Sequence, residues 1–190
     1  MSVAVILAGG KSRRMGRDKL TLELDGQTLL QSAVNRFAQE FEIVCLSVAD
    51  LSKYPEVQAR RIADIYRGAG PLSGLHAALR QFPGVFLVAA DLPYSCPHMA
   101  KRVAELCGEH EACVIRLPDG RLEPLFGFYR DSILGRCEAA IKSQDYRMTE
   151  ILRNSDTRYV SPTELGDMWD EKLLINVNYP QDYLDIQRAP

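Results

Sequence analysis

The sequence has few of the residues that build disulfide frameworks or metal centres. Its five cysteines are odd in number, scattered, and form no C-x-x-C pair, which argues against a disulfide scaffold and a thiolate zinc site. Its three histidines lie far apart and have no ligand spacing with cysteines or acidic residues. We therefore expect reduced cysteines that pack as small apolar side chains, and histidines that bind no metal.

Long apolar runs and an excess of one charge are also missing. The 23 basic and 25 acidic residues give a net charge of −2, so there is no general attraction to nucleic acids or membrane surfaces. The N-terminal apolar run is too short for a signal peptide or a membrane span. No repeat or low-complexity linker divides the chain. These features predict a cytoplasmic protein of one domain, residues 1–190, with no nucleic-acid or membrane partner.

The most informative stretch is residues 7–19, L-A-G-G-K-S-R-R-M-G-R-D-K, which follows an apolar run at 3–6. A buried strand that opens into a loop with three glycines and five cations is suited to anions, because glycine lets backbone N–H groups approach phosphate oxygens closely. Val5 stands where a Walker A loop needs glycine, and Lys11 interrupts the dinucleotide fingerprint G-x-G-x-x-G. A G-x-S-x-G hydrolase elbow is absent as well. We expect a ligand that carries phosphates.

Apolar strands and helical segments alternate along the rest of the chain. Strands are predicted at 3–6, 41–48, 61–64, 85–90, 112–116 and 122–129, with an extended segment at 20–24; helices are predicted at 28–39, 71–81, 98–107, 132–142, 148–154 and 181–187. The alternation predicts a doubly wound α/β sandwich whose sheet is mainly parallel with one antiparallel strand. Its cleft should lie at the carboxyl ends of the strands.

Two further segments fall where such a cleft would form. The apolar strand at 85–90 is followed by Asp91, at the end of the strand where open α/β sheets bind ligands and where a carboxylate suits a metal ion. A helix cap or a turn is the alternative role for this aspartate. The glycine-rich segment 68–74 precedes a helix, so its amides are placed to face a phosphate, although an ordinary loop would have the same composition.

These segments together resemble the molybdenum cofactor guanylyltransferases, the MobA family of nucleotidyltransferases. Residues 7–19 match L-A-G-G-x-S-x-R-M-G-x-D-K, residues 91–93 match D-x-P, residues 70–74 match G-P-L-x-G, and residues 176–180 match N-x-N-T-P with Tyr179 in place of threonine. Residues 123–127 resemble the family segment beside the second substrate, and equally a core strand with an edge proline. The resemblance implies a Rossmann-like nucleotidyltransferase sandwich. It spans nearly the whole chain but is sparse from 100 to 174.

The resemblance also implies roles for particular residues. Catalysis is assigned to Lys19, Arg13, Arg14 and Asp91, with Mg²⁺ held on Asp91; the nucleotide is assigned to Leu7, Ala8, Gly9, Gly10, Lys19, Asp64 and Asp91; the second substrate is assigned to Gly70, Gly74, Asn176 and Asn178. The expected substrates are GTP and molybdopterin, the molybdenum cofactor. The expected products are molybdopterin guanine dinucleotide and pyrophosphate. Other cofactor-biosynthesis or acceptor proteins would be transient partners.

The nucleotide base and the acceptor leave alternatives open. Cytidylyl relatives resemble L-A-A-G, whereas Gly9 leaves room for a purine, and Asp64 matches the family position near the nucleoside. Ser47 stands where some relatives carry a base-contacting asparagine, which weakens the case for guanine. The alternatives are cytidylyl transfer to the same cofactor, transfer to a sugar or isoprenoid phosphate, and a nucleotide-binding module without chemistry.

Overall fold

The computed structural model describes residues 1–9, 18–24 and 26–176. The strands are β1 (Val3–Leu7), β2 (Glu23–Leu24), β3 (Gln27–Thr28), β4 (Ile43–Val48), β5 (Arg60–Ala63), β6 (Gly84–Ala89), β7 (Ala112–Arg116), β8 (Leu122–Arg130) and β9 (Thr157–Val160). The helices are α1 (Leu29–Phe37), α2 (Pro71–Leu79), α3 (Pro97–Leu106), α4 (Leu134–Lys142), α5 (Met148–Arg153) and α6 (Pro162–Leu165). Short 3-10 helices are η1 (Lys19–Thr21), η2 (Asp131–Ile133), η3 (Gly166–Met168) and η4 (Glu171–Leu174). Within these ranges, no helix is long and apolar enough to cross a membrane.

Seven strands form one sheet in the order β5-β4-β1-β6-β8-β7-β9, and β2 pairs with β3 in a separate hairpin. In the large sheet β8 runs antiparallel to both of its neighbours, whereas the other pairs are parallel. β1 lies between β4 and β6, and all five of its side chains are buried, as expected of a parallel strand covered on both faces. The sheet is mainly parallel with one antiparallel strand, which confirms the predicted fold class.

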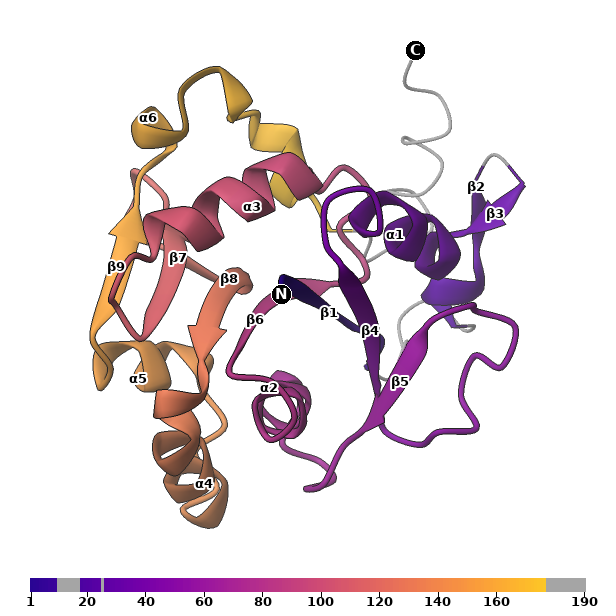
Figure 1. Ribbon diagram of the computed structural model, residues 1–190, viewed down its shortest axis with the longest axis horizontal. Helices are drawn as coiled ribbons and strands as arrows, with labels where there is room; N and C mark the ends of the chain where they lie inside the picture. Colours follow the sequence, from indigo (N-terminus) through magenta and orange to yellow (C-terminus); the bar gives the residue numbers. More distant parts are fainter. Residues whose placement is uncertain (10–17, 25, 177–190) are drawn as a thin grey trace.

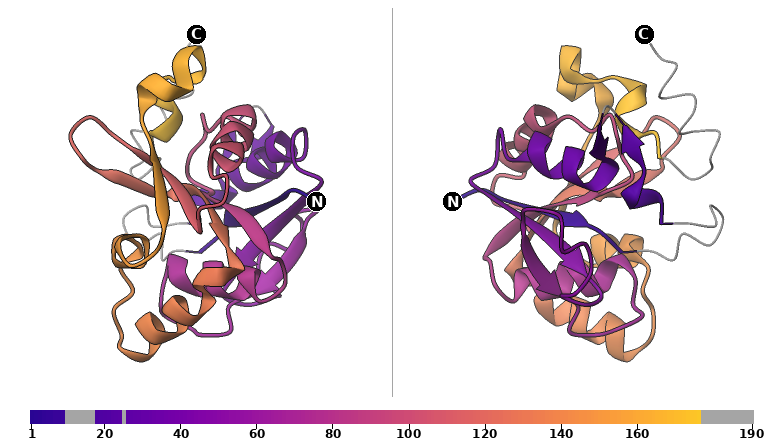
Figure 2. Two further views of the ribbon diagram at one scale, coloured as in Figure 1. Left: turned by 60° about the vertical axis from the view of Figure 1, so that its left-hand side comes forward. Right: turned by 90° about the vertical axis from the view of Figure 1, so that its right-hand side faces the viewer.

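Helices cover both faces of the sheet. Side chains of α1 and α3 pack with one set of strand residues, which includes Ile6 and Phe86, and those of α2, α4 and α5 pack with the alternate set, which includes Val5 and Leu87. Neighbouring residues enter different layers because successive side chains of a strand point to opposite faces. Figure 1 and Figure 2 show α1 and α3 above the sheet and α2 and α4 below it.

Three local differences from the sequence-based expectation have physical reasons. Residues 19–21 form a 3-10 turn rather than extended chain, because the Asp18 side chain caps the turn by accepting from Leu20 N–H at 3.1 Å. β9 was not predicted, because it has four residues and only Val160 is fully buried.

Pro124 lies in a central strand, not at an edge. The pairing of β7 with β8 shifts register beside it, and a bulge tolerates the missing N–H of proline. The helix predicted at 181–187 lies outside the described residues.

Candidate active site

The carboxyl ends of four adjacent parallel strands form one edge of the sheet. Along the order β5, β4, β1 and β6, this edge carries Asp64, Ser47 with its neighbour Val48, Ala8 and Asp91. Backbone bonds hold it together: Asp64 N–H donates to Val48 O at 2.9 Å, and Ala8 N–H donates to Ser47 O at 2.9 Å. This is the edge at which open α/β sheets bind ligands.

Lys19 and Asp91 meet at this edge although they are 72 positions apart in the chain. Lys19 Nζ lies 2.5 Å from Asp91 Oδ2, and the two side chains are only 18% and 20% exposed. Lys19 opens η1, directly after the capping Asp18, and Asp91 follows the buried end of β6. The structure therefore brings together the cation and the carboxylate that the sequence predicts for phosphate and metal binding. Because the pair is partly buried, dissolved salt screens their attraction less than it would in open water.

A half-buried arginine holds the chain that follows Asp91. Arg36, on α1, donates from Nη2 to the Leu92 carbonyl at 3.1 Å and to Ser95 Oγ at 3.3 Å, and Ser95 Oγ donates to the same carbonyl at 2.8 Å. Burial lowers the pKa of the guanidinium, whose Nε is buried without a hydrogen-bond partner in the part of the chain that the structure describes. Burying this cation costs free energy of desolvation, and its hydrogen bonds fix the turn that carries Asp91.

Asp64 stands at the far end of the edge, next to Ser47. The Ser47 hydroxyl donates to Asp64 Oδ1 at 3.4 Å. Partial burial raises the pKa of the Asp64 carboxyl to about 6, and the bond from Ser47 partly offsets that rise. Asp64 is therefore an acceptor whose charge changes close to neutral pH, as is common for groups in functional clefts.

The two glycines predicted for the second substrate have different surroundings. Gly70 is exposed and precedes Pro71 with φ 59° and ψ −139°, a conformation essentially confined to glycine. It is the N-cap of α2, whose first residue, Pro71, has no N–H, and the Ser73 N–H already donates to the Gly70 carbonyl at 3.0 Å. Gly74 is buried inside α2, and a Cβ there would lie 2.2 Å from Ser47 Oγ and 2.6 Å from Leu7 Cδ2. Gly74 therefore permits a close approach between α2 and the strand ends, and its contact with a substrate stays a prediction.

The start of the glycine-rich loop is already engaged in the sheet. The Ala8 amide is bonded to Ser47, the Leu7 carbonyl accepts from Ala90 N–H at 3.3 Å, and both side chains are buried. Amides that approach a phosphate must therefore begin at Gly9, which is exposed and would have open space around an added Cβ. Leu7 and Ala8 are thus bonded into the sheet, and their contact with the nucleotide stays a prediction.

Part of the predicted site cannot be placed. Gly10, Arg13, Arg14 and Asn178 lie outside the described residues. Asn176, the last described residue, is exposed. The phosphate-side arginines and the asparagine pair remain predictions. Arg36 and Tyr54, a tyrosine that bonds to Asp18, belong to the surroundings of the site but were not predicted, because each is a single residue in no motif and gains its meaning only from tertiary contacts.

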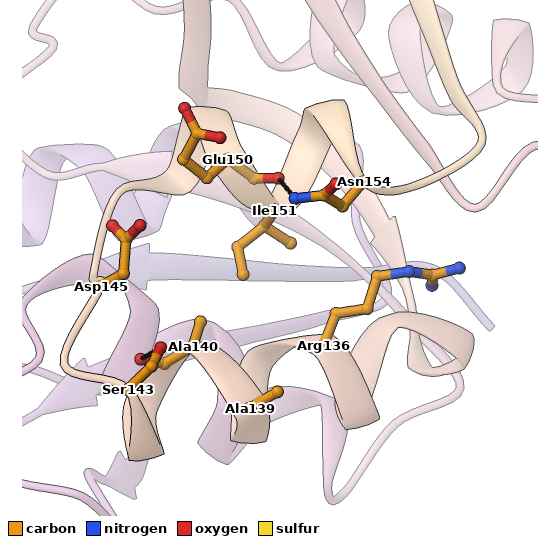
Figure 3. A pocket seen from close by; sticks show the side chains of 8 residues that line it. All are labelled: Arg136, Ala139, Ala140, Ser143, Asp145, Glu150, Ile151 and Asn154. Atoms are coloured by element: carbon orange, nitrogen blue, oxygen red, sulfur yellow. Dashed lines mark hydrogen bonds between the residues drawn. The ribbon is translucent and has the colours of Figure 1, made fainter.

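A separate cavity of about 420 Å³ lies between α4 and α5 (Figure 3) and includes none of the predicted site residues. Its charged side chains already have partners: Arg136 bonds to Glu111, Asp145 to Arg147, and Glu150 to Arg153. Within the described residues, the charged side chains of this cavity are therefore engaged with neighbours of their own.

Comparison with known proteins agrees with this geometry. The sequence matches the family described as MobA-like NTP transferase domain over residues 4–159. A probable molybdenum cofactor guanylyltransferase from Thermococcus kodakarensis is 32% identical over 186 residues, covering 95% of this chain and 91% of the relative. A protein of the same name from Pelotomaculum thermopropionicum is 31% identical over 184 residues, covering 95% and 89%.

Solved structures share the fold. Molybdopterin-guanine dinucleotide biosynthesis protein A from Archaeoglobus fulgidus superposes with a TM-score of 0.85 at 24% identity, covering 98% of this chain and 97% of that one. The 2-C-methyl-D-erythritol 4-phosphate cytidylyltransferase from Thermus thermophilus has a TM-score of 0.70 at 15% identity, covering 98% of both chains. At these identities the likeness speaks to the fold alone. The family match, together with the paired Lys19 and Asp91 at the strand ends, shows that this chain is a nucleotidyltransferase of the MobA-like NTP transferase family.

Proposed function

We propose that this enzyme transfers GMP from GTP to the terminal phosphate of molybdopterin, forming molybdopterin guanine dinucleotide and releasing pyrophosphate. The observation that carries the proposal is the contact of Lys19 with Asp91 at the carboxyl end of β6. The names of the relatives from Thermococcus and Pelotomaculum, both probable molybdenum cofactor guanylyltransferases, support the choice of substrates.

The donor set at Asp91 fits a magnesium ion that arrives with the nucleotide. Across the described ranges, no group of three or more His, Cys, Asp or Glu side chains could hold a metal by itself. Mg²⁺ commonly binds through one or two carboxylates together with substrate phosphates and water, and Asp91 supplies one carboxylate, at present shared with the Lys19 ammonium. When bound, the ion would neutralise charge on the phosphates.

The chemistry needs positioning more than proton transfer. An oxygen of the acceptor phosphate forms a bond to the α-phosphorus of GTP, and the bond from that phosphorus to the bridging oxygen breaks, so that pyrophosphate leaves with the electron pair. The second pKa of a phosphomonoester is about 6, so the acceptor is already largely dianionic at neutral pH and needs no general base. Lys19 would place positive charge beside the phosphates, where fixed charge stabilises the transition state.

Asp64 is the residue we propose for selecting guanine. Guanine presents N1–H and N2–H donors, and an ionised carboxylate accepts both. Asp64 is half-buried, so a base with acceptors in those positions would leave the carboxylate unsatisfied, at a cost of roughly 1–3 kcal/mol. We therefore expect GTP to be preferred over CTP and ATP by at least about tenfold in kcat/KM. The open space around Gly9 is compatible with a purine.

The test is incubation of the purified protein with Mg²⁺, molybdopterin and GTP, CTP or ATP in turn, with pyrophosphate release and the dinucleotide product both measured. A parallel series replaces molybdopterin with sugar phosphates. Preferred formation of the guanine product supports the proposal. A cytosine product, or reaction only with a sugar phosphate, rejects the guanylyltransferase assignment, and release of no pyrophosphate with any acceptor would indicate a nucleotide-binding role.

A further inference from the structure

Tyr54 occupies a backbone conformation that side chains rarely adopt. It lies in the connection from β4 to β5 with a positive φ of 52°. For a bulky residue this conformation is strained, and it persists only where surrounding contacts enforce it. Positions of this kind cluster at functional sites, so the contacts made by the backbone and the hydroxyl of Tyr54 are informative.

Arg61 holds the backbone of this connection. From β5 it donates through Nη2 to the carbonyls of Tyr54 at 2.6 Å and Val57 at 3.0 Å, and through Nε to the carbonyl of Lys53 at 3.1 Å. One planar guanidinium thus gathers three carbonyls of a surface loop. Because β5 is paired with β4 in the sheet, the loop is tied to a rigid element.

The Tyr54 hydroxyl holds the loop that carries Lys19. It donates to Asp18 Oδ2 at 2.7 Å, while Asp18 Oδ1 accepts from Leu20 N–H at 3.1 Å and so caps η1. Partial burial and the nearby Asp18 raise the pKa of Tyr54 well above its ordinary value, so the hydroxyl keeps its proton throughout the working range. Both oxygens of Asp18 are therefore fixed, one by the β4–β5 connection and one by the turn that begins at Lys19.

We propose that Tyr54 is a positioning residue for Lys19, acting through Asp18. This inference rests on the proposed function, because its consequence for turnover assumes that Lys19 acts on the phosphates. The hydroxyl fixes Asp18, Asp18 fixes the first turn of η1, and that turn aims the ammonium group at Asp91, 2.5 Å away. Without the hydroxyl, the ring still packs against the apolar cluster beneath it, but the turn has lost its outer anchor.

The test compares Tyr54→Phe with Tyr129→Phe. Tyr129 is a matched control because its hydroxyl also makes one short bond, to the Pro124 carbonyl at 2.6 Å, and is buried in the opposite layer. We expect Tyr54→Phe to lower kcat about tenfold at saturating substrates, with KM for the acceptor changed less than about twofold. Tyr129→Phe should lower the unfolding temperature at least as much and leave kcat within about twofold of wild type. An equal loss of kcat in both variants, or no loss in Tyr54→Phe, would overturn the proposal.

A double-mutant cycle tests the route through Asp18. In an Asp18→Ala background, where residue 18 offers the Tyr54 hydroxyl no side-chain acceptor, Tyr54→Phe should lower kcat by less than about twofold, because residues that act on one another are not additive. A full tenfold loss in that background would show that Tyr54 does not act through Asp18.

A measurement without substrates separates this inference from the proposed function. Reductive ¹³C-dimethylation of the lysines leaves their charge in place, and the Lys19 resonance can be assigned by its absence in Lys19→Arg. We expect Tyr54→Phe, but not Tyr129→Phe, to move this resonance toward those of exposed lysines. If the resonance moves while the wild-type enzyme makes no guanine dinucleotide, the positioning role stands and the proposed function fails. A resonance that does not move refutes the positioning role whatever the activity.

Discussion

Substitution of Gly74 by alanine tests the packing at the centre of the site. The added Cβ would lie 2.2 Å from Ser47 Oγ and 2.6 Å from Leu7 Cδ2, so both side chains must move. Overpacking of a filled interior costs about 1–3 kcal/mol, while alanine is a better helix former than glycine by up to about 1 kcal/mol. We expect a net destabilisation of about 1 kcal/mol, which lowers the unfolding temperature of a chain of this length by about 2–4 °C.

The control is Gly135→Ala. Gly135 also lies in a helix, α4, but it is exposed and an added Cβ would meet no atom within 4 Å. Here only the gain in helix propensity remains, so we expect stabilisation by about 0.5–1 kcal/mol. Thermal and urea unfolding of both variants measure the difference. If Gly74→Ala unfolds at the same temperature as Gly135→Ala, the close approach of α2 to β1 and β4 is not as described.

The same substitution has a second consequence through Ser47. A Ser47 side chain displaced by the new methyl can no longer donate to Asp64, so we expect KM for GTP to rise with the loss of stability. Adding Ser47→Ala to Gly74→Ala removes the oxygen at the closest contact and should recover part of the stability, with a coupling of at least about 0.5 kcal/mol. Strict additivity of the two substitutions would contradict this account.

Other predictions concern the two ends of the site. Asp91→Ala and Lys19→Ala should each lower kcat by roughly 10²-fold or more, because each removes fixed charge at the reacting phosphates; normal turnover of both at saturating Mg²⁺ would refute their assignment. Below pH 6 the Asp64 carboxylate, with its pKa raised to about 6, takes up a proton and stops accepting from guanine. The acceptor phosphate titrates in the same range in wild type and in Asp64→Asn alike, so the ratio of kcat/KM for GTP of wild type to that of Asp64→Asn should fall about tenfold between pH 7 and pH 5. Arg36→Met should change the free energy of unfolding in urea by less than about 2 kcal/mol, because the loss of hydrogen bonds and the removal of a buried cation have opposite effects. The same substitution should lower kcat about tenfold. An unchanged kcat would show that catalysis does not depend on the hold of Arg36 on the turn after Asp91.

Sequence patterns located the central part of this site because its residues are consecutive or follow obvious strands. A buried five-residue strand before a basic glycine-rich loop, and an apolar strand before Asp91, predict that both segments lie at the carboxyl ends of parallel strands, where the cleft is expected. In the structure the side chains of Lys19 and Asp91 lie 2.5 Å apart, and their roles toward phosphate and metal stay predictions. The predicted family is confirmed by the match over residues 4–159.

The supporting residues could not be found in this way. Arg36 looks like an ordinary helical arginine until the fold places the Leu92 carbonyl beside it, and Tyr54 becomes informative only through its positive φ and its bond to Asp18. β9 could not be predicted, because a four-residue edge strand with one fully buried side chain has too weak a hydrophobic pattern. In each case the determining interaction joins segments distant in sequence, which local propensity does not encode.

The central position of β1 has a consequence for the order in which the molecule assembles. β1 is made first, yet one of its two neighbours is β6, paired through contacts such as Ala4 with Phe86. β7 and β8 pair across a short hairpin, for example Val114 with Gly127, and closing a short loop loses less chain entropy than closing a long one. We therefore expect the hairpin to form early and the contact between Lys19 and Asp91 to form late, so that this ion pair is complete only when folding is complete.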